Sequence, residues 1–331
     1  MEEALPPARS GANEALTPCE AATVTTTARL HFGFLDPSGR GPRPFGSFGL
    51  ALDRPQTRLT LVRSADWRVQ GPEAERAEGY LRMLAANAGM QTPYRLGIDT
   101  VIPPHAGLGS GTQLALTVGT AFARLEGLAM SPAEIAALLG RGARSGIGIG
   151  TFAAGGLVVD TGPRDGALPE IETRLPFPDD WRALLVFDER RAGLSGIDEV
   201  SAFATLPEFT AHDTAALSRR VESALAAVEA RDFGRFSAEV GALQDAMGAY
   251  FGPLQGGPFV SPAVAASMER LRAEGVTGIG QSSWGPTGFA FAPSQADAEA
   301  ILDDIRAAGA PAGLRFDIAQ GRNRGADIET S

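Results

Sequence analysis

A run of glycines and hydroxyl residues between an apolar strand and an apolar helix is the segment of this chain best suited to chemistry. Residues 103–112 have the sequence Pro-Pro-His-Ala-Gly-Leu-Gly-Ser-Gly-Thr. Glycine permits backbone conformations that other residues rarely adopt, so successive N–H groups can converge on an anion. The helix expected next would aim the positive end of its dipole at the same point. The segment therefore predicts a phosphate or diphosphate site, with a simple tight turn as the alternative.

This glycine loop matches neither of two common nucleotide-binding motifs. The chain contains no lysine, since all 29 of its basic residues are arginine, and this excludes a P-loop lysine and a lysine Schiff base. Its Gly-Leu-Gly-Ser-Gly stretch also lacks the G-x-G-x-x-G spacing of dinucleotide-binding folds. A bound anion must therefore be held by arginine, backbone N–H groups, hydroxyls or a metal ion.

Composition restricts the class of protein. The chain has 331 residues, enough for about two domains, and a net charge of −10 that argues against nucleic-acid binding. One cysteine excludes a disulfide framework, and the three histidines lie too far apart for metal-ligand spacing. No apolar run approaches the roughly 20 residues of a membrane span, and a secretory signal is not expected. We expect a cytoplasmic protein with small-molecule partners, no nucleic acid and no membrane, and keep a homodimer as an option.

The elements that must position the glycine loop mix strands and helices without strict βαβ repetition, which favours an α+β fold. Apolar and β-branched runs predict strands at 24–34, 48–52, 58–62, 94–102, 181–188, 276–280, 288–292 and 313–318. Helical periodicity predicts helices at 73–88, 112–125, 214–230, 236–250, 261–274 and 295–308, and a further helix after the capping box that begins at Ser131.

The domain organisation follows from shifts in composition. Residues 1–22 are rich in Pro, Ala and Glu and predict a flexible N-terminal extension. A Pro- and Asp-containing stretch near 175–180 marks the expected boundary between an N-terminal domain over 23–178 and a C-terminal domain over 179–322. Residues 323–331 are polar and predict a frayed tail.

Several spaced motifs together resemble a known family. The pattern P-x-x-x-G-L-G-S, which begins at Pro103 or Pro104, resembles the phosphate loop of the GHMP kinase superfamily. Residues 28–36 (ARLHFGFLD), 45–52 (FGSFGLAL) and 281–287 (QSSWGPT), with Gly193–Gly196 and Glu199, resemble β-ribofuranosylaminobenzene 5′-phosphate synthases. The resemblance covers residues 24–320. It implies a GHMP-kinase-like two-domain architecture, with a ribosomal-S5-domain-2-like N-terminal part and a ferredoxin-like C-terminal part.

The chain departs from the kinases of that superfamily at two positions. Those kinases commonly have a second serine after G-L-G-S, where this chain has Gly111. They also have a catalytic aspartate in a later S-G-x-D segment, where this chain has Gly148. A kinase of this kind would lack its usual base and a metal-binding hydroxyl.

The resemblance implies another reaction. Phosphoribosyl diphosphate would lose pyrophosphate while the carboxylate-bearing carbon of 4-aminobenzoate attacks the sugar, and loss of CO2 would leave a C-riboside for tetrahydromethanopterin biosynthesis. Mg²⁺ is the expected cofactor, with its ligands unassigned. Three alternatives stay open: a C-nucleoside synthase for a heteroaromatic carboxylate, a small-molecule kinase, and a non-catalytic phosphosugar-binding protein.

The same resemblance and the glycine loop together give the candidate site residues. The expected catalytic residues are Arg29, His31 and Glu199. The expected substrate-binding residues are Ser47, His105, Gly107, Gly109, Ser110, Gly111, Thr112, Gln113, Arg144, Ser145, Gln281, Ser282, Ser283 and Trp284. Some also have a purely structural interpretation: Arg29 as a strand-face cation, His31 as a buried structural histidine, His105 as a turn residue and Trp284 as a core anchor. Arg29 and His31 lie two apart, so their side chains share one face of the predicted strand.

Overall fold

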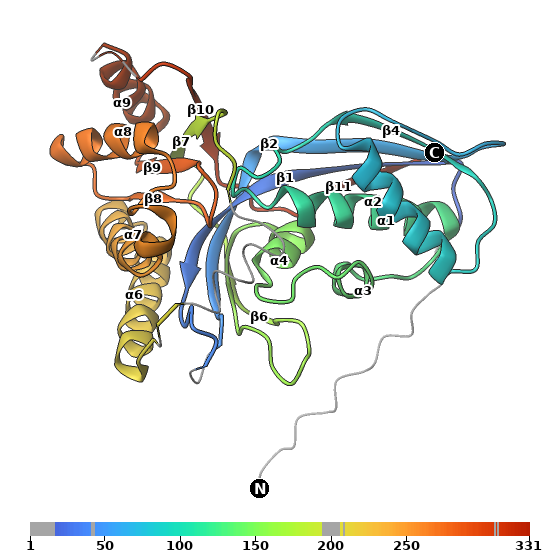
Figure 1. The fold of residues 1–331 in the computed structure, drawn as a ribbon, viewed down its shortest axis with the longest axis horizontal. Coiled ribbons are helices and arrows are strands. Elements are labelled where there is room, and N and C mark those ends of the chain that lie inside the picture. Colours follow the sequence, from blue (N-terminus) through green and yellow to red (C-terminus); the bar gives the residue numbers. More distant parts are fainter. Residues whose placement is uncertain (1–16, 41–43, 194–205, 208, 308, 310) are drawn as a thin grey trace, which may run out of the picture.

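Two long antiparallel strands, β1 (Ala21–Phe34) and β2 (Ser47–Arg63), join the two halves of the molecule (Figure 1). The computed structural model describes residues 17–331 apart from 41–43, 194–205, 208, 308 and 310. The strand pairing shifts between Thr27 and Arg29, opposite the segment of β2 that contains Pro55. Proline has no N–H to donate, so it is found at such irregularities. The prediction of two strands at 48–52 and 58–62 is wrong: they form one strand that continues through this irregularity.

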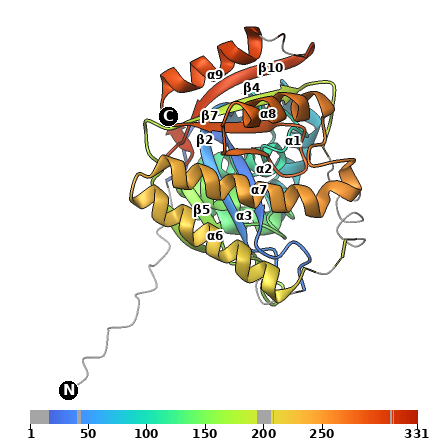
Figure 2. The ribbon, with the colours of Figure 1, turned by 90° about the vertical axis from the view of Figure 1, so that its left-hand side faces the viewer.

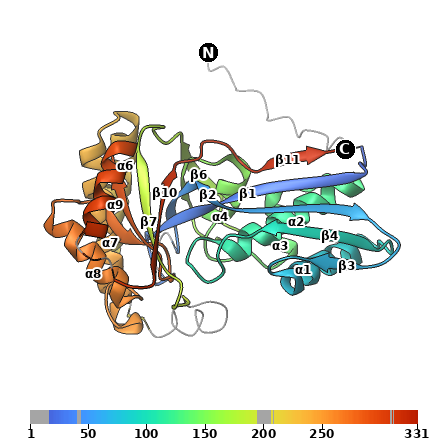
Figure 3. The same ribbon diagram turned by 90° about the horizontal axis from the view of Figure 1, so that it is seen from above.

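The N-terminal half is a sheet with helices on one face (Figure 3). Its strand order is β11-β1-β2-β4-β3, and β5 and β6 extend the sheet from β2. The further strands are β3 (Arg68–Gln70), β4 (Tyr94–Thr100), β5 (Leu157–Asp160), β6 (Ile171–Leu175) and β11 (Asp327–Thr330). The helices are α1 (Ala74–Asn87), α2 (Ser110–Glu126), α3 (Pro132–Leu138) and α4 (Ile147–Ala154). Apolar side chains of α1 and α2 pack on β1, β2 and β4, and this core holds the start of α2 in place.

The C-terminal half is an antiparallel sheet of order β10-β7-β9-β8 between two layers of helices (Figure 2). The strands are β7 (Arg182–Asp188), β8 (Ile279–Gln281), β9 (Gly288–Ala292) and β10 (Leu314–Gln320). The helices are α6 (Ala211–Glu229), α7 (Phe233–Gln255), α8 (Pro262–Ala273) and α9 (Gln295–Ala307). Alternate residues of β7 enter the two separate cores on either side of the sheet. This strand order, with α8 and α9 on one face, confirms the ferredoxin-like prediction.

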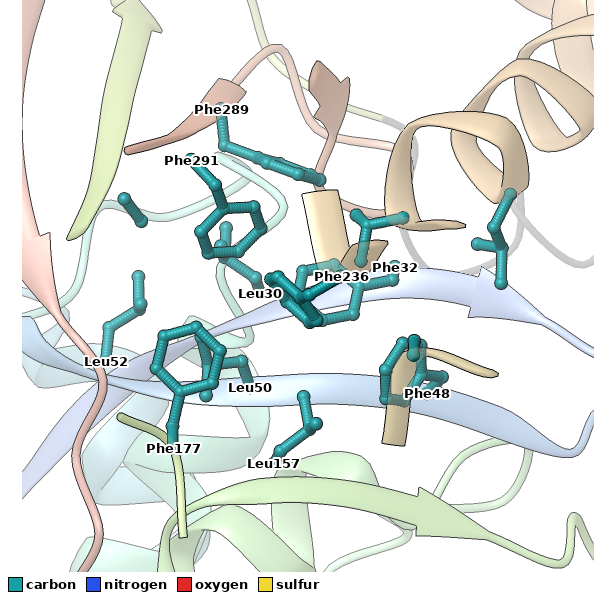
Figure 4. Close-up of a cluster of buried hydrophobic side chains, with 14 of the residues drawn as sticks. Leu30, Phe32, Phe48, Leu50, Leu52, Leu157, Phe177, Phe236, Phe289 and Phe291 are labelled. Atoms are coloured by element: carbon teal, nitrogen blue, oxygen red, sulfur yellow. The ribbon is translucent and has the colours of Figure 1, made fainter. Parts of the chain in front are cut away.

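The largest hydrophobic core lies between the two halves (Figure 4). Phe32 of β1 is fully buried, and its ring centroid lies 5.0 Å from that of Phe48, 5.5 Å from Phe289 and 5.8 Å from Phe291. The same cluster includes Phe236 of α7. Since it draws on β1, β2, α7 and β9, this core fixes the end of β1 against the C-terminal half.

The predicted helices are confirmed, and the capping box at Ser131 is present with both of its hydrogen bonds. The prediction of a frayed tail is wrong, because β11 pairs with residues 22–25 of β1. The short strands β3, β5 and β6 and helix α4 were not predicted. Residues 1–16 of the predicted extension lie outside the described residues, and β1 begins at Ala21.

Candidate active site

The glycine loop forms the entry to α2, as its sequence predicts. Gly107 and Gly109 both have φ of +81°, a backbone region that side chains disfavour, and Gly109 is the N-cap of the helix. No side chain caps this helix start, so the backbone N–H groups of its first turn face outward from the helix end. The arrangement can bind an anion through N–H groups and the helix dipole.

Three arginines from separate elements surround this helix start. Arg29 of β1 donates to the carbonyl oxygen of Gly107, and its guanidinium lies 3.3 Å from the position that a Cβ on Gly109 would occupy. A Cβ on Gly111 would lie 2.5 Å from Arg141 Nη2 and 3.1 Å from Arg76 Nη2. Because the chain has no lysine, arginine must supply any positive charge near this helix start. Guanidinium groups bind phosphate oxygens in a bidentate manner.

A loop of the C-terminal half, residues 281–287, packs directly against the glycine loop. Ser282 is fully buried, and its Oγ donates to the Gly107 carbonyl oxygen at 2.8 Å and accepts from the His31 N–H at 3.0 Å. The Ser283 N–H donates to the carbonyl oxygen of His31 at 3.2 Å. The structure thus brings together the β1 motif, the glycine loop and the 281–287 motif.

His31 is buried at the centre of this junction, with 3% of its surface exposed. Its Nε2 lies 3.2 Å from Ser145 Oγ, and its Nδ1 has no hydrogen-bond partner among the described residues. Burial, with a smaller effect from the positive charge of Arg29, holds the pKa of His31 well below its usual value. The imidazole is therefore neutral near pH 7.

Ser145 connects His31 to a buried carboxylate that the sequence analysis missed. Asp160, at the end of β5, has no exposed surface, and its Oδ2 lies 3.3 Å from Ser145 Oγ. Three backbone N–H groups also donate to this carboxylate, those of Ser47, Gly146 and Gly162. Burial raises the pKa of Asp160 to about 6, although these hydrogen bonds oppose the shift.

Two residues of the 281–287 loop, Ser283 and Trp284, also line a pocket together with residues of β1 and α7. His31, Phe34, Phe251 and Trp284 are among its lining residues, and the ring centroids of Phe251 and Trp284 are 4.6 Å apart. Gln244, Gln255 and Gln281 line it as well. Flat, apolar walls with a few polar groups suit an aromatic ligand.

Other predicted residues have different surroundings. The Gln113 amide accepts from Thr26 Oγ1 at 2.6 Å and donates to the Gly148 carbonyl at 2.8 Å, so it ties α2 to β1 and α4. Ser47 Oγ donates to the carbonyl of Phe45, and Ser47 is fully buried. His105 is exposed, whereas Ser110, Gly111 and Thr112 in the first turn of α2 are half-buried, as is Arg144 in the segment between α3 and α4. Glu199 lies outside the described residues.

Gly148 faces the first turn of α2. A Cβ at this position would lie 3.0 Å from Thr112 Cγ2 and 3.8 Å from Gln113 Nε2. The position where the resemblance implies a catalytic carboxylate in the kinases is therefore close to the first turn of α2 and has no side chain.

Neither a metal cluster nor a membrane helix is found in the described part of the chain. Its residues contain no group of three or more His, Cys, Asp or Glu that could hold a metal ion. None of its helices is long and apolar enough to cross a membrane.

The fold and its anion site together define the class of the GHMP kinases. Residues 75–156 match the GHMP kinases N terminal domain, and residues 224–311 match the GHMP kinases C terminal domain. Within this class, the chain belongs to the β-ribofuranosylphenol 5′-phosphate synthase family. It is 31% identical over 329 residues to the synthase of Archaeoglobus fulgidus, covering 92% of this chain and 99% of that protein. It is 27% identical over 330 residues to that of Methanothermobacter thermautotrophicus, covering 92% and 97%.

Solved structures share the fold at low sequence identity. A homoserine kinase from Cytophaga hutchinsonii aligns with a TM-score of 0.65 and 17% identity, covering 94% of this chain and 98% of that one. A mevalonate diphosphate decarboxylase from Staphylococcus aureus aligns with a TM-score of 0.66 and 15% identity, with the same coverage. These likenesses confirm the predicted architecture. At this level of identity they show the fold alone and not the reaction.

Proposed function

We propose that this protein transfers a 5-phosphoribosyl group from phosphoribosyl diphosphate to the carboxylate-bearing carbon of an aromatic acid, with release of pyrophosphate and CO2. The product would be a C-riboside of the tetrahydromethanopterin pathway, in line with the name of its relatives. The observation that supports this proposal best is that the 281–287 loop contacts the glycine loop, which arginines surround, and also contributes Ser283 and Trp284 to a pocket with aromatic lining residues.

The donor would bind at the start of α2. Its diphosphate accepts hydrogen bonds from the N–H groups of the first turn, while Arg76 and Arg141 neutralise the negative charge. When the C1–O bond breaks, its electron pair leaves with pyrophosphate, so the same groups stabilise the leaving group. Arg29, between this loop and His31, is placed to contact either the donor or the acceptor carboxylate.

The acceptor ring would occupy the aromatic pocket. An electron-donating group para to the carboxylate raises electron density on the carbon that attacks C1, and breakage of the C–CO2 bond then returns an electron pair to the ring. The relatives' name contains a phenol, and the sequence resemblance implies 4-aminobenzoate. Both acceptors have such a group, so an assay should compare 4-hydroxybenzoate with 4-aminobenzoate.

Mg²⁺ would enter with the donor. The described residues offer no cluster of carboxylates for a resident ion, whereas diphosphate oxygens are good Mg²⁺ ligands. Ser110 and Thr112, whose hydroxyls lie in the first turn of α2, are the residues that could add oxygen ligands. When bound, the ion would neutralise charge on the leaving pyrophosphate.

The test is one set of incubations with phosphoribosyl diphosphate and Mg²⁺. We expect pyrophosphate and CO2 in equal amounts with 4-hydroxybenzoate or 4-aminobenzoate, and none without an acid. If only a heteroaromatic carboxylate reacts, the acceptor is that acid and not a benzoate. If phosphoribosyl diphosphate binds but no acid reacts, the protein is a non-catalytic phosphosugar-binding protein. ATP-dependent phosphorylation of homoserine or mevalonate would contradict the proposal, because Gly148 offers no general base.

A further inference from the structure

The chain of contacts from Asp160 through Ser145 to His31 determines which nitrogen of the imidazole holds the proton. Each backbone N–H that reaches Asp160 can only donate, so the carboxylate is built to accept. Ser145 Oγ has one proton and two candidate acceptors, Asp160 Oδ2 at 3.3 Å and His31 Nε2 at 3.2 Å. A hydrogen bond to a charged acceptor is the stronger of the two.

If Ser145 donates to Asp160, its oxygen must accept the proton of His31 Nε2. The alternative would place a proton on Nδ1, which is buried without a partner among the described residues. An unpaired buried N–H costs free energy comparable to a lost hydrogen bond. Both considerations favour one tautomer, with the proton on Nε2 and a lone pair on Nδ1.

We propose that Asp160, acting through Ser145, is a positioning residue that fixes this tautomer, so that His31 Nδ1 accepts a hydrogen bond from the para hydroxyl or amino group of the aromatic acceptor. The proposal rests on the proposed function. His31 is a lining residue of the aromatic pocket, and its buried Nδ1 is the polar atom of the ring that has no hydrogen-bond partner among the described residues. A lone pair repels a carboxylate but accepts from O–H or N–H, and accepting that bond raises electron density on the ring carbon para to it. The lowered pKa of His31 keeps the lone pair available near pH 7.

The first test needs no substrate. We expect ¹⁵N-histidine NMR of the full chain to show His31 as the neutral tautomer protonated on Nε2, since only three histidines contribute signals. Ser145→Ala removes the bridge but leaves three backbone donors on Asp160, so it should fold and lose this single tautomer. Ser145→Thr should restore it, and Ser267→Ala, which removes another buried hydroxyl, should leave it unchanged. An unchanged tautomer in Ser145→Ala would overturn the proposal.

The second test uses ligands. Wild type should bind 4-hydroxybenzoate more tightly than 4-methoxybenzoate, which cannot donate, and Ser145→Ala should remove the difference. In turnover, Ser145→Ala should lower kcat about 10–100-fold with little change in KM for phosphoribosyl diphosphate. A loss of donor affinity instead would contradict a role through His31. If no aromatic acid reacts with wild type, the proposed function fails, whereas the tautomer experiment still decides the role of Asp160.

Discussion

At the scale of single residues, Gly109 combines two demands, a left-handed backbone and space for an arginine. We predict that Gly109→Val weakens phosphoribosyl diphosphate binding by at least about tenfold, because valine strains the φ of +81° and displaces the Arg29 guanidinium. Calorimetry measures the affinity. The matched control is Gly89→Val, where φ is +67° and a Cβ would have no neighbour within 4 Å. Equal donor affinity in both folded variants would contradict the assignment of the loop.

His31 and Asp160 affect stability in opposite directions as pH falls. The folded pKa of His31 lies well below 6.5, so the unfolded chain binds an extra proton below pH 6.5 and stability falls on acidification. The folded pKa of Asp160 is about 6 against 3.8, so the folded chain binds the extra proton and stability rises as pH falls through that window.

We therefore predict that His31→Gln removes the loss of stability that His31 causes on acidification, so that the remaining pH dependence reflects Asp160. Relative to wild type, the variant should gain up to about 1.4 kcal/mol in unfolding free energy for each pH unit below 6.5. Urea unfolding between pH 7.5 and 5 measures this difference. The control His212→Gln changes an exposed side chain on α6 and should follow wild type. Parallel curves for His31→Gln would mean that folding leaves the pKa of His31 unchanged.

The residues of the site differ in how visible they are in the sequence. The glycine loop, Arg29, His31 and Ser282 were predicted because they stand in motifs with characteristic spacing. Asp160 was missed because it ends a short apolar run, Leu157–Asp160, where a carboxylate normally marks the exit of a strand to solvent. Its burial depends on backbone N–H groups from other segments, and no local pattern records those contacts.

At the scale of elements, the proposed anion site at the start of α2 needs cations from neighbouring elements. Arg76 belongs to α1, and Arg141 lies in the segment between α3 and α4. Each appears in the sequence as an ordinary arginine near a helix end, and only tertiary packing brings them to Gly111. Arg141 Nε is buried without a hydrogen-bond partner among the described residues, so an anion would satisfy it.

We predict that Arg76→Gln and Arg141→Gln each raise the KM for phosphoribosyl diphosphate by about tenfold, because each removes a charge-assisted contact to phosphate. The KM for the aromatic acid should change little. The control is Arg82→Gln on the outer face of α1, where Arg82 pairs with Glu78 at 2.6 Å. An effect confined to the aromatic acid would place the acceptor, and not the donor, at this helix start.

The elements that were missed share a physical cause. Strands β3, β5, β6 and β11 have three to five residues each, too few for periodicity to be seen. Strand β11 also pairs with β1 across almost the whole length of the sequence, so its order comes from a partner that the local sequence does not reveal. Long helices with a buried stripe, such as α6 and α7, were predicted because each contains several turns of the repeat.

At the scale of the whole molecule, the site depends on a core that belongs to both halves. Leu30, Phe32 and Leu50 of the long strands pack with Phe289 and Phe291 of the C-terminal sheet (Figure 4). The donor loop lies in the N-terminal half, whereas Trp284 and Phe251 of the pocket wall belong to the C-terminal half. Under the proposed function, rigid packing between the halves would therefore set the distance between donor and acceptor.

We predict that the two halves unfold in one cooperative transition. Phe32→Ala should lower the unfolding free energy by about 3–5 kcal/mol, since it leaves a cavity between three phenylalanine rings. Single-tryptophan variants provide separate probes: Trp67 contacts Tyr94 in the N-terminal half, and Trp181 contacts Phe236 in the C-terminal half. Both probes should report the same denaturant midpoint, before and after the substitution.

The reciprocal control uses Phe122, a buried ring of α2 in the core beneath α1, 5.7 Å from the Tyr94 ring. If the halves are coupled, Phe122→Ala must also shift the midpoint reported by the distant Trp181. A Trp181 midpoint that stays in place while that of Trp67 falls would show that the halves unfold independently. The spacing of donor and acceptor would then have to be fixed by the 281–287 loop alone, and Ser282→Ala, which removes its bridge to Gly107, would become the substitution with the largest effect on kcat.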